Sequence, residues 1–190
     1  MGNNDSSITP LFIRVEKPSL KASLAGISGA LYSILVIVFG FVSFQFTQVR
    51  IADLLIPLAL FFGEPIAAGV FIGGVIGNFY GVAIGLTIPL DVLTGAVANL
   101  LAALAGYRFQ RHNKFSGIRQ AIFTQAAILI ENTVVTMIVG TTLAFLIPLS
   151  GSLLVSIMLW YSGLFIGSLI AMNIFGFITY ETIRRAWRRI

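Results

Sequence analysis

Residues 53–107 read DLLIPLALFFGEPIAAGVFIGGVIGNFYGVAIGLTIPLDVLTGAVANLLAALAGY, an apolar stretch of 55 residues. It is interrupted at Gly63-Glu64-Pro65 and again between Gly81 and Pro89. Apolar runs of this length are typical of helices that cross a lipid bilayer, because a helix satisfies its own backbone hydrogen bonds. The two interruptions leave room for either two or three crossings.

The composition of the whole chain places it in lipid. Of 190 residues, 57% are hydrophobic and 10% are charged, and the mean hydropathy is +0.97. A soluble domain carries roughly a quarter charged residues. The apolar runs lack the strict alternation of barrel strands, so we predict an all-α integral membrane protein. The sequence contains no cysteine, which excludes disulfides and thiolate metal sites.

The basic residues decide between two and three middle crossings. Eleven of the twelve lie before the first apolar span, in one loop after residue 107, or at the C-terminal end: Arg14, Lys17, Lys21, Arg108, Arg111, Lys114, Arg119, Arg184, Arg185, Arg188 and Arg189. Three middle crossings place all eleven in the cytoplasm and leave Arg50 outside, as the positive-inside rule requires. Two crossings would place the basic loop outside.

We therefore predict a bundle of six transmembrane helices with both termini in the cytoplasm. The predicted helices are about 20–43, 54–62, 65–80, 89–107, 120–146 and 153–180, between a cytoplasmic segment 1–19 and a basic cytoplasmic tail 181–190. The second helix is too short to cross alone, so we expect a cavity or loop to fill the missing depth.

Small residues at a spacing of four predict close helix packing. Gly69, Gly73, Gly77, Gly81 and Gly85 form one such row, and Ala22, Gly26 and Ala30 form another on the first helix. Backbones approach closely at such rows, so the glycine row predicts packing within the bundle. The row on the first helix suits either internal packing or partner docking, and its spacing alone favours internal packing.

Polar residues inside an apolar bundle are candidate site residues. In the predicted topology Arg50, Asp53, Asn78 and Asp91 converge on the outer side from separate segments, as a pocket with a few placed polar groups needs. The alternative is that Arg50 pairs with Asp53 and both face water.

Glu131 and Asn132 fall near the middle of the fifth helix. A lone carboxylate there is expected to face the bundle interior and to be protonated, paired or ligand-bound, which indicates a functional role. Asn99 and Asn173 are expected to bridge helices.

No catalytic or metal-binding pattern is present in the sequence. It lacks a phosphate-binding loop, a nucleophile with a partner base, and a zinc motif, so we predict neither an enzyme nor a cofactor. The positive charges flank membrane segments, so nucleic acid is not an expected partner. A bundle with a pocket and no ATP site suggests one part of a larger machine, embedded in membrane lipid.

Three stretches resemble the QueT-type transporters. They are VRIADLLIP (49–57), FIGGVIGN (71–78) and LDVLTG (90–95). The resemblance implies a substrate-binding (S) component of an energy-coupling factor (ECF) transporter for queuosine precursors, which are deazaguanine bases. It also implies a transmembrane T component and two cytoplasmic ATPase subunits as partners. Small residues on the first helix often dock the T component in such proteins, which favours docking for Ala22, Gly26 and Ala30.

The chain departs from the family pattern at one position. The family's sixth helix carries Gly-Glu-Leu-Ile, whereas this chain reads Gly167-Ser168-Leu169-Ile170. A lost carboxylate in a pocket changes which ligands fit, and one hypothesis is that Glu131 replaces it.

Alternative functions remain open from sequence. One is an S component for a different vitamin. Another is a self-sufficient homodimeric secondary carrier with Glu131 as its proton site. A structural or assembly protein is the third, and the outer polar residues argue against it.

Overall fold

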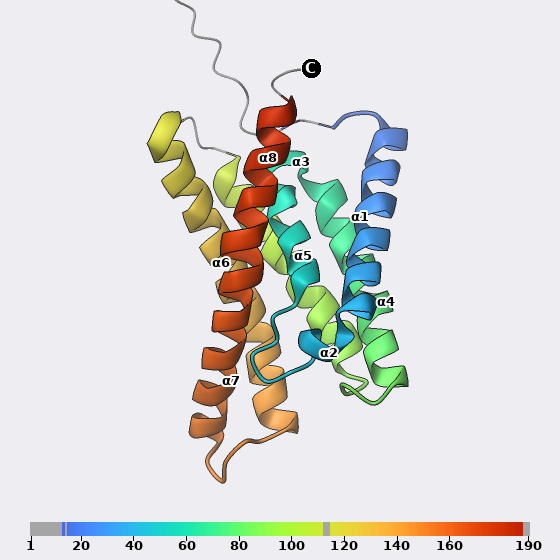
Figure 1. Ribbon diagram of the computed structural model, residues 1–190, viewed down its shortest axis with the longest axis vertical. Helices are drawn as coiled ribbons and strands as arrows, with labels where there is room; N and C mark the ends of the chain where they lie inside the picture. Colours follow the sequence, from blue (N-terminus) through green and yellow to red (C-terminus); the bar gives the residue numbers. More distant parts are fainter. Residues whose placement is uncertain (1–12, 14, 112–114, 188–190) are drawn as a thin grey trace, which may run out of the picture.

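The computed structural model describes residue 13, residues 15–111 and residues 115–187, and this part of the chain contains helices and no strand. Figure 1 shows long helices side by side, with the start of α1 and the end of α8 at the same end of the molecule. The elements are α1 (Pro18–Val38), α2 (Gly40–Ser43), the 3-10 helix η1 (Ile51–Leu58), α3 (Ala59–Phe62), α4 (Glu64–Ala83), α5 (Asp91–Gln110), α6 (Gly117–Leu146), α7 (Leu153–Ser168), the π-helical segment η2 (Leu169–Gly176) and α8 (Phe177–Trp187).

Five helical units in the described part are long and apolar enough to span a membrane. They are α1, α4, α5, α6 and the continuous run α7–η2–α8. The apolar unit Ile51–Phe62, made of η1 and α3, is shorter. Its eight 3-10 residues and four α-helical residues reach roughly 22 Å, against about 30 Å of hydrocarbon. The second predicted helix is therefore too short to cross the bilayer by itself, and the six-helix topology with cytoplasmic termini stays a prediction.

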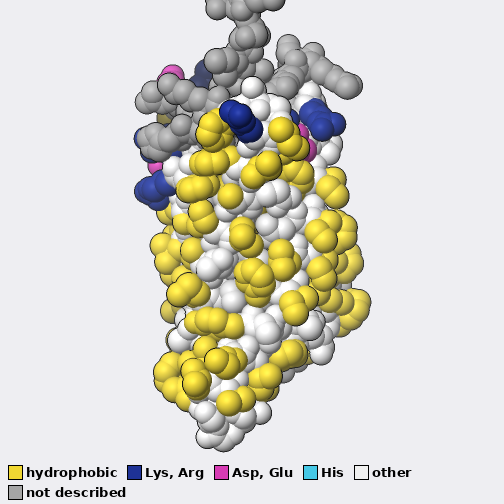
Figure 2. Space-filling view, turned by 90° about the vertical axis from the view of Figure 1, so that its left-hand side faces the viewer, with side chains coloured by type: hydrophobic (Ala, Val, Ile, Leu, Met, Phe, Trp, Pro, Cys, Tyr) yellow, Lys and Arg dark blue, Asp and Glu magenta, His cyan; other side chains and the backbone are white. Residues whose placement is uncertain are grey.

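Charge is distributed unevenly along the molecule. Figure 2 shows a flank covered by hydrophobic side chains, with Lys and Arg side chains near one end. The basic residues at this end lie at the start of α1, around the α5–α6 connection and on α8: Lys17, Lys21, Arg108, Arg111, Arg119, Arg184 and Arg185. Arg14, Lys114, Arg188 and Arg189 lie outside the described residues. We call this the basic end.

Glycines let α1 and α4 pack backbone against backbone. A Cβ atom on Gly73 would lie 2.5 Å from the carbonyl oxygen of Gly29, and one on Gly77 would lie 2.8 Å from Val36. The packing predicted from the glycine row is confirmed at these positions. Gly85 differs, because it lies beyond α4 with φ +74° and has open space around it.

The small-residue row on α1 faces away from the bundle. Ala22, Gly26 and Ala30 are all exposed, and a Cβ on Gly26 would meet no atom within 4 Å. Gly29, on the neighbouring face, makes the contact with α4 instead. The internal packing that spacing alone favours for this row is therefore wrong. The spacing identifies a smooth helix face but not the direction in which it points.

The chain crosses the bundle between α2 and η1. Figure 1 shows residues 44–50 passing from α2 across the molecule before the chain turns back into η1. Glycines on α7 make room for it: a Cβ on Gly163 would lie 2.7 Å from the Phe46 carbonyl oxygen, and one on Gly167 would collide with the Thr47 carbonyl oxygen. That this segment fills the depth of bilayer left by the short η1–α3 unit stays a prediction.

Helix boundaries differ from the predicted ones where the backbone leaves α-helical geometry. The first predicted helix, 20–43, is broken at Phe39, whose φ of −102° and ψ of 26° end α1. The second begins earlier than predicted, at Ile51. The last continues through η2 to Trp187, into the predicted tail.

Candidate functional site

A cluster of buried polar side chains occupies the half of the bundle away from the basic end. None of its members is more than 4% exposed: Tyr32, Arg50, Asp53, Asn78, Asp91 and Asn99. They come from α1, from η1 and the residue before it, from α4 and from α5. We call this group the Arg50 cluster.

Tyr32 joins three helices within the cluster. Its hydroxyl donates a hydrogen bond to Asp53 Oδ1 over 2.5 Å and accepts one from Asn99 Nδ2 over 2.7 Å. These two bonds tie α1 to η1 and to α5. Because Tyr32 is fully buried, both bonds are made away from bulk solvent, and they hold the Asp53 carboxylate in one place.

Asp91 is the first residue of α5 and the centre of a second set of contacts. Its Oδ2 accepts a hydrogen bond from Thr87 Oγ1 over 3.0 Å and lies 4.0 Å from Arg50 Nη2. Asn78 Nδ2 donates to the Asp91 backbone carbonyl over 2.9 Å. A Cβ on Gly95 would lie 2.5 Å from that amide nitrogen, so the glycine makes room for Asn78.

Several polar atoms of the cluster have no hydrogen-bond partner within the described part of the chain. They are Nε and Nη2 of Arg50, Oδ1 of Asn78 and Oδ1 of Asp91. The Arg50 guanidinium lies 5.4 Å from the centre of the Phe44 ring. Leaving a buried polar group unmatched costs about 1–3 kcal/mol, so donors and acceptors gathered here favour a polar ligand.

The four outer residues predicted from sequence therefore meet in one place. Arg50, Asn78 and Asp91 share direct contacts, and Asp53 joins them through Tyr32. The alternative in which Arg50 and Asp53 both face water does not hold, because they are 4% and 3% exposed. The ion pair that the structure shows for Arg50 joins it to Asp91.

Glu131 lies elsewhere in the bundle. It is fully buried and faces α5, where a Cβ on Gly106 would collide with its carboxyl group. Gly106 is seven residues further along α5 than Asn99, roughly 10 Å toward the basic end. Neither carboxyl oxygen has a hydrogen-bond partner among the described residues. Glu131 thus faces the bundle interior as predicted, but outside the Arg50 cluster.

Asn132 belongs to a polar contact between α6 and η2. It accepts a hydrogen bond from Thr136 Oγ1 over 3.1 Å, and its Nδ2 lies 3.4 Å from Asn173 Oδ1. Asn173 Nδ2 in turn donates to Gln125 Oε1 over 3.2 Å. The two bonds that involve Asn173 bridge α6 and η2, which is the role that the sequence predicts for Asn173.

Ser168, the departure from the family pattern, is 3% exposed at the end of α7. Because the Glu131 carboxyl turns toward α5, its replacement of the missing carboxylate stays a hypothesis. Within the described residues, no group of three or more His, Asp or Glu side chains lies close enough to hold a metal.

Sequence reasoning missed Tyr32, which belongs to the cluster, and Thr87, which donates a hydrogen bond to Asp91 from outside it. A tyrosine in an apolar helix reads as a core residue, and a uniformly apolar helix has little periodicity to show which face is buried. The sequence feature that could have indicated Tyr32 is its position four residues after Ser28, which places both polar groups on the same face of the helix. Thr87 lies four residues before the first residue of α5, and no sequence pattern indicated that it contacts the cluster.

Spanning helices around a buried polar cluster are the architecture of a multi-pass membrane transport protein. Residues 23–185 match the QueT transporter family, and the chain belongs to that family. It is thus a multi-pass cell membrane protein and not an enzyme, and its family transports queuosine precursors. Comparison with curated proteins and with solved structures gave no match.

Proposed function

We propose that this chain is the S component of an ECF-type transporter and that it binds a deazaguanine base in the Arg50 cluster. A transmembrane T component and two cytoplasmic ATPases supply the energy. The chain crosses the membrane six times, with the basic end in the cytoplasm. The Arg50 cluster then lies in the outer half of the bundle, where an importer meets its substrate.

The observation that carries the proposal is the set of unpartnered atoms. A guanine-type base presents a carbonyl acceptor beside a ring N–H and an exocyclic amino group, both donors. Arg50 offers free donors, and Asp91 Oδ1 and Asn78 Oδ1 offer free acceptors. The two sets are complementary. Enzymes that hold a single base combine such hydrogen bonds with stacking on a flat side chain, and Phe44 supplies a ring beside Arg50.

Two features support the need for partners. The sequence has no phosphate-binding loop, so ATP hydrolysis requires another chain. Ala22, Gly26 and Ala30 form an exposed, smooth face on α1, and such faces let another helix approach closely. This face is where we place the T component.

Calorimetric titration of the detergent-purified chain tests the ligand. The panel contains 7-deazaguanine bases, guanine, adenine and water-soluble vitamins. We expect submicromolar binding of one deazaguanine base. Adenine presents the reversed donor and acceptor pattern, so it should bind at least about a hundredfold more weakly. Tight binding of a vitamin instead would remove the substrate assignment and leave the architecture.

Transport by the chain alone tests the machinery. We expect proteoliposomes that contain only this protein to accumulate no substrate under a proton gradient. Accumulation that depends on the gradient and is lost in Glu131→Gln would contradict the proposal and indicate a secondary carrier.

A further inference from the structure

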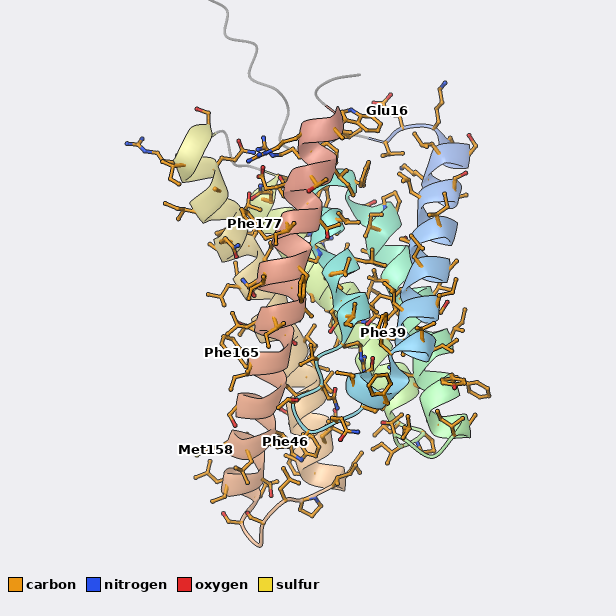
Figure 3. All side chains as sticks on the ribbon, viewed as in Figure 1. Glu16, Phe39, Phe46, Met158, Phe165 and Phe177 are labelled. Atoms are coloured by element: carbon orange, nitrogen blue, oxygen red, sulfur yellow. The ribbon has the colours of Figure 1, made fainter. Side chains whose placement is uncertain are left out.

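A groove lies between the first turn of α6 and the side of α8, far from the Arg50 cluster. It holds about 600 Å³. Its apolar walls include Ile118, Ala121, Phe177 and Ile178, and its polar rim includes Arg184 and Arg185. Figure 3 shows Phe177 where α6 and α8 lie beside each other.

The groove opens on the outside of the bundle at the basic end. Ile118 is 75% exposed and Ile178 is 56% exposed. Figure 2, which faces the α6 side, shows the apolar flank continuing up to the basic side chains. In a spanning bundle this is the level at which hydrocarbon gives way to headgroups. The neighbours that meet the apolar walls there are lipid chains.

The rim carries an excess of positive charge. Arg184 donates to Glu181 through Nε over 3.1 Å and through Nη2 over 2.6 Å. Its Nη1 is buried and has no hydrogen-bond partner among the described residues. Arg185 Nε lies 3.5 Å from the same carboxylate, and the Arg185 side chain is 75% exposed. Glu181 offsets one of the two arginine charges, so a positive charge and a buried donor remain.

The N-terminus of α6 lies on the opposite wall of the groove. Gly117 is the first residue of this 30-residue helix and lines the groove. Ser116, at the N-cap, makes no side-chain hydrogen bond to the first turn. The initial backbone N–H groups of a helix carry partial positive charge and bind anions, phosphate in particular.

We propose that this groove binds one anionic phospholipid. The phosphate lies between Arg184, Arg185 and the first turn of α6, and an acyl chain packs along the apolar walls. Basic pockets between transmembrane helices suit acidic headgroups, whereas a zwitterionic lipid leaves the excess arginine charge unmatched. This site is independent of the transported substrate.

Native mass spectrometry of the full chain in detergent tests the proposal. The protein is incubated with equal amounts of dioleoyl phosphatidylglycerol and dioleoyl phosphatidylcholine. We expect one retained phosphatidylglycerol and roughly a tenfold preference over phosphatidylcholine, the size of a charge-assisted contact. Equal retention of the two lipids would overturn the proposal.

Three variants locate the bound lipid. The double variant Arg184→Gln, Arg185→Gln removes both cations of the rim, so the preference should fall to near one. Ala121→Phe fills the groove and should reduce retention of both lipids. Arg119→Gln removes a cation at the same end that does not line the groove, and the preference should persist. Loss of the preference in Arg119→Gln alone would show a diffuse charge effect and overturn the site.

Competition separates a lipid site from a phosphate site. We expect millimolar glycerol 3-phosphate to leave the retained lipid in place, because it lacks acyl chains to fill the groove. Displacement at that concentration would overturn the lipid assignment. Thermal unfolding in detergent, run on each variant, identifies any variant that fails to fold. Ala121→Phe leaves the ion pair between Arg184 and Glu181 intact, so it tests the groove without removing a charge.

Discussion

Hydrogen bonds from single side chains fix the geometry of the Arg50 cluster. The Tyr32 hydroxyl serves Asp53 and Asn99 at once, and Asp91 holds contacts to Arg50, Asn78 and Thr87. Because these groups are buried, removing one polar atom leaves its hydrogen-bond partner unmatched in an apolar interior. Conservative substitutions are therefore informative here.

Tyr32→Phe should destabilise the protein by about 1–3 kcal/mol, because Asp53 and Asn99 each lose a hydrogen bond in the interior. The matched control is Tyr161→Phe, whose hydroxyl pairs with Thr141 at a partly exposed position and should matter little. Thermal unfolding in detergent compares the two. Equal shifts would show that the buried pairing of Tyr32 contributes no more than a surface bond.

Arg50→Lys should weaken ligand binding roughly tenfold. Lysine keeps the positive charge beside Asp91 but lacks the two guanidinium atoms, Nε and Nη2, that are free to donate. Calorimetry with the tightest ligand measures the change, and Arg119→Lys, at an exposed position, is the control. Unchanged affinity in Arg50→Lys would place the ligand elsewhere.

At this scale the sequence predicted which polar residues meet but not how. Arg50, Asp53, Asn78 and Asp91 stood out because ionisable and amide groups are rare in apolar segments. Tyr32 did not, since an aromatic ring suits lipid, core and interface equally. For Glu131 the sequence indicated burial but not the neighbour. The carboxyl group lies against α5 at Gly106, and no sequence pattern links these two residues.

At the scale of helices, the packing of α1 on α4 depends on the absence of side chains. Gly73→Ala places a Cβ about 2.5 Å from the Gly29 carbonyl, so the helices must separate, at a cost of about 1–3 kcal/mol. Gly26→Ala makes the same chemical change on α1 in open space, and helix propensity predicts a slight gain. Thermal unfolding distinguishes them, and a drop of the same size in both would contradict the packing argument.

The long helices were predictable because their apolar runs have clear ends. Pro148 and Gly151 mark the turn between α6 and α7, and the chain turns there. The 3-10 geometry of η1 and the π-helical geometry of η2 were not predictable. These two segments pack against each other in the bundle centre, where Gly176 accommodates Pro57, so their geometry follows from tertiary contacts rather than from local propensity.

At the scale of the whole molecule, the two faces of α1 have different roles under the proposed function. Gly29 packs inside, whereas Ala22, Gly26 and Ala30 stay exposed and available to the T component. A change on the exposed face should therefore affect the assembled transporter and leave the isolated chain unchanged. Ligand binding and transport separate these two effects.

Gly26→Leu should lower substrate uptake by the assembled transporter at least about tenfold, because a branched side chain prevents close approach of another helix. Affinity of the isolated chain for the same ligand should not change, since nothing in the bundle lies within 4 Å of that position. Ile27→Phe adds bulk one residue away, about 100° around the helix, where the side chain is already 61% exposed, and should leave uptake intact. If both variants retain full uptake, the T component docks on another face. Weakened ligand binding in Gly26→Leu alone would show instead that this face supports the fold, since a docking surface acts only when the partner is present.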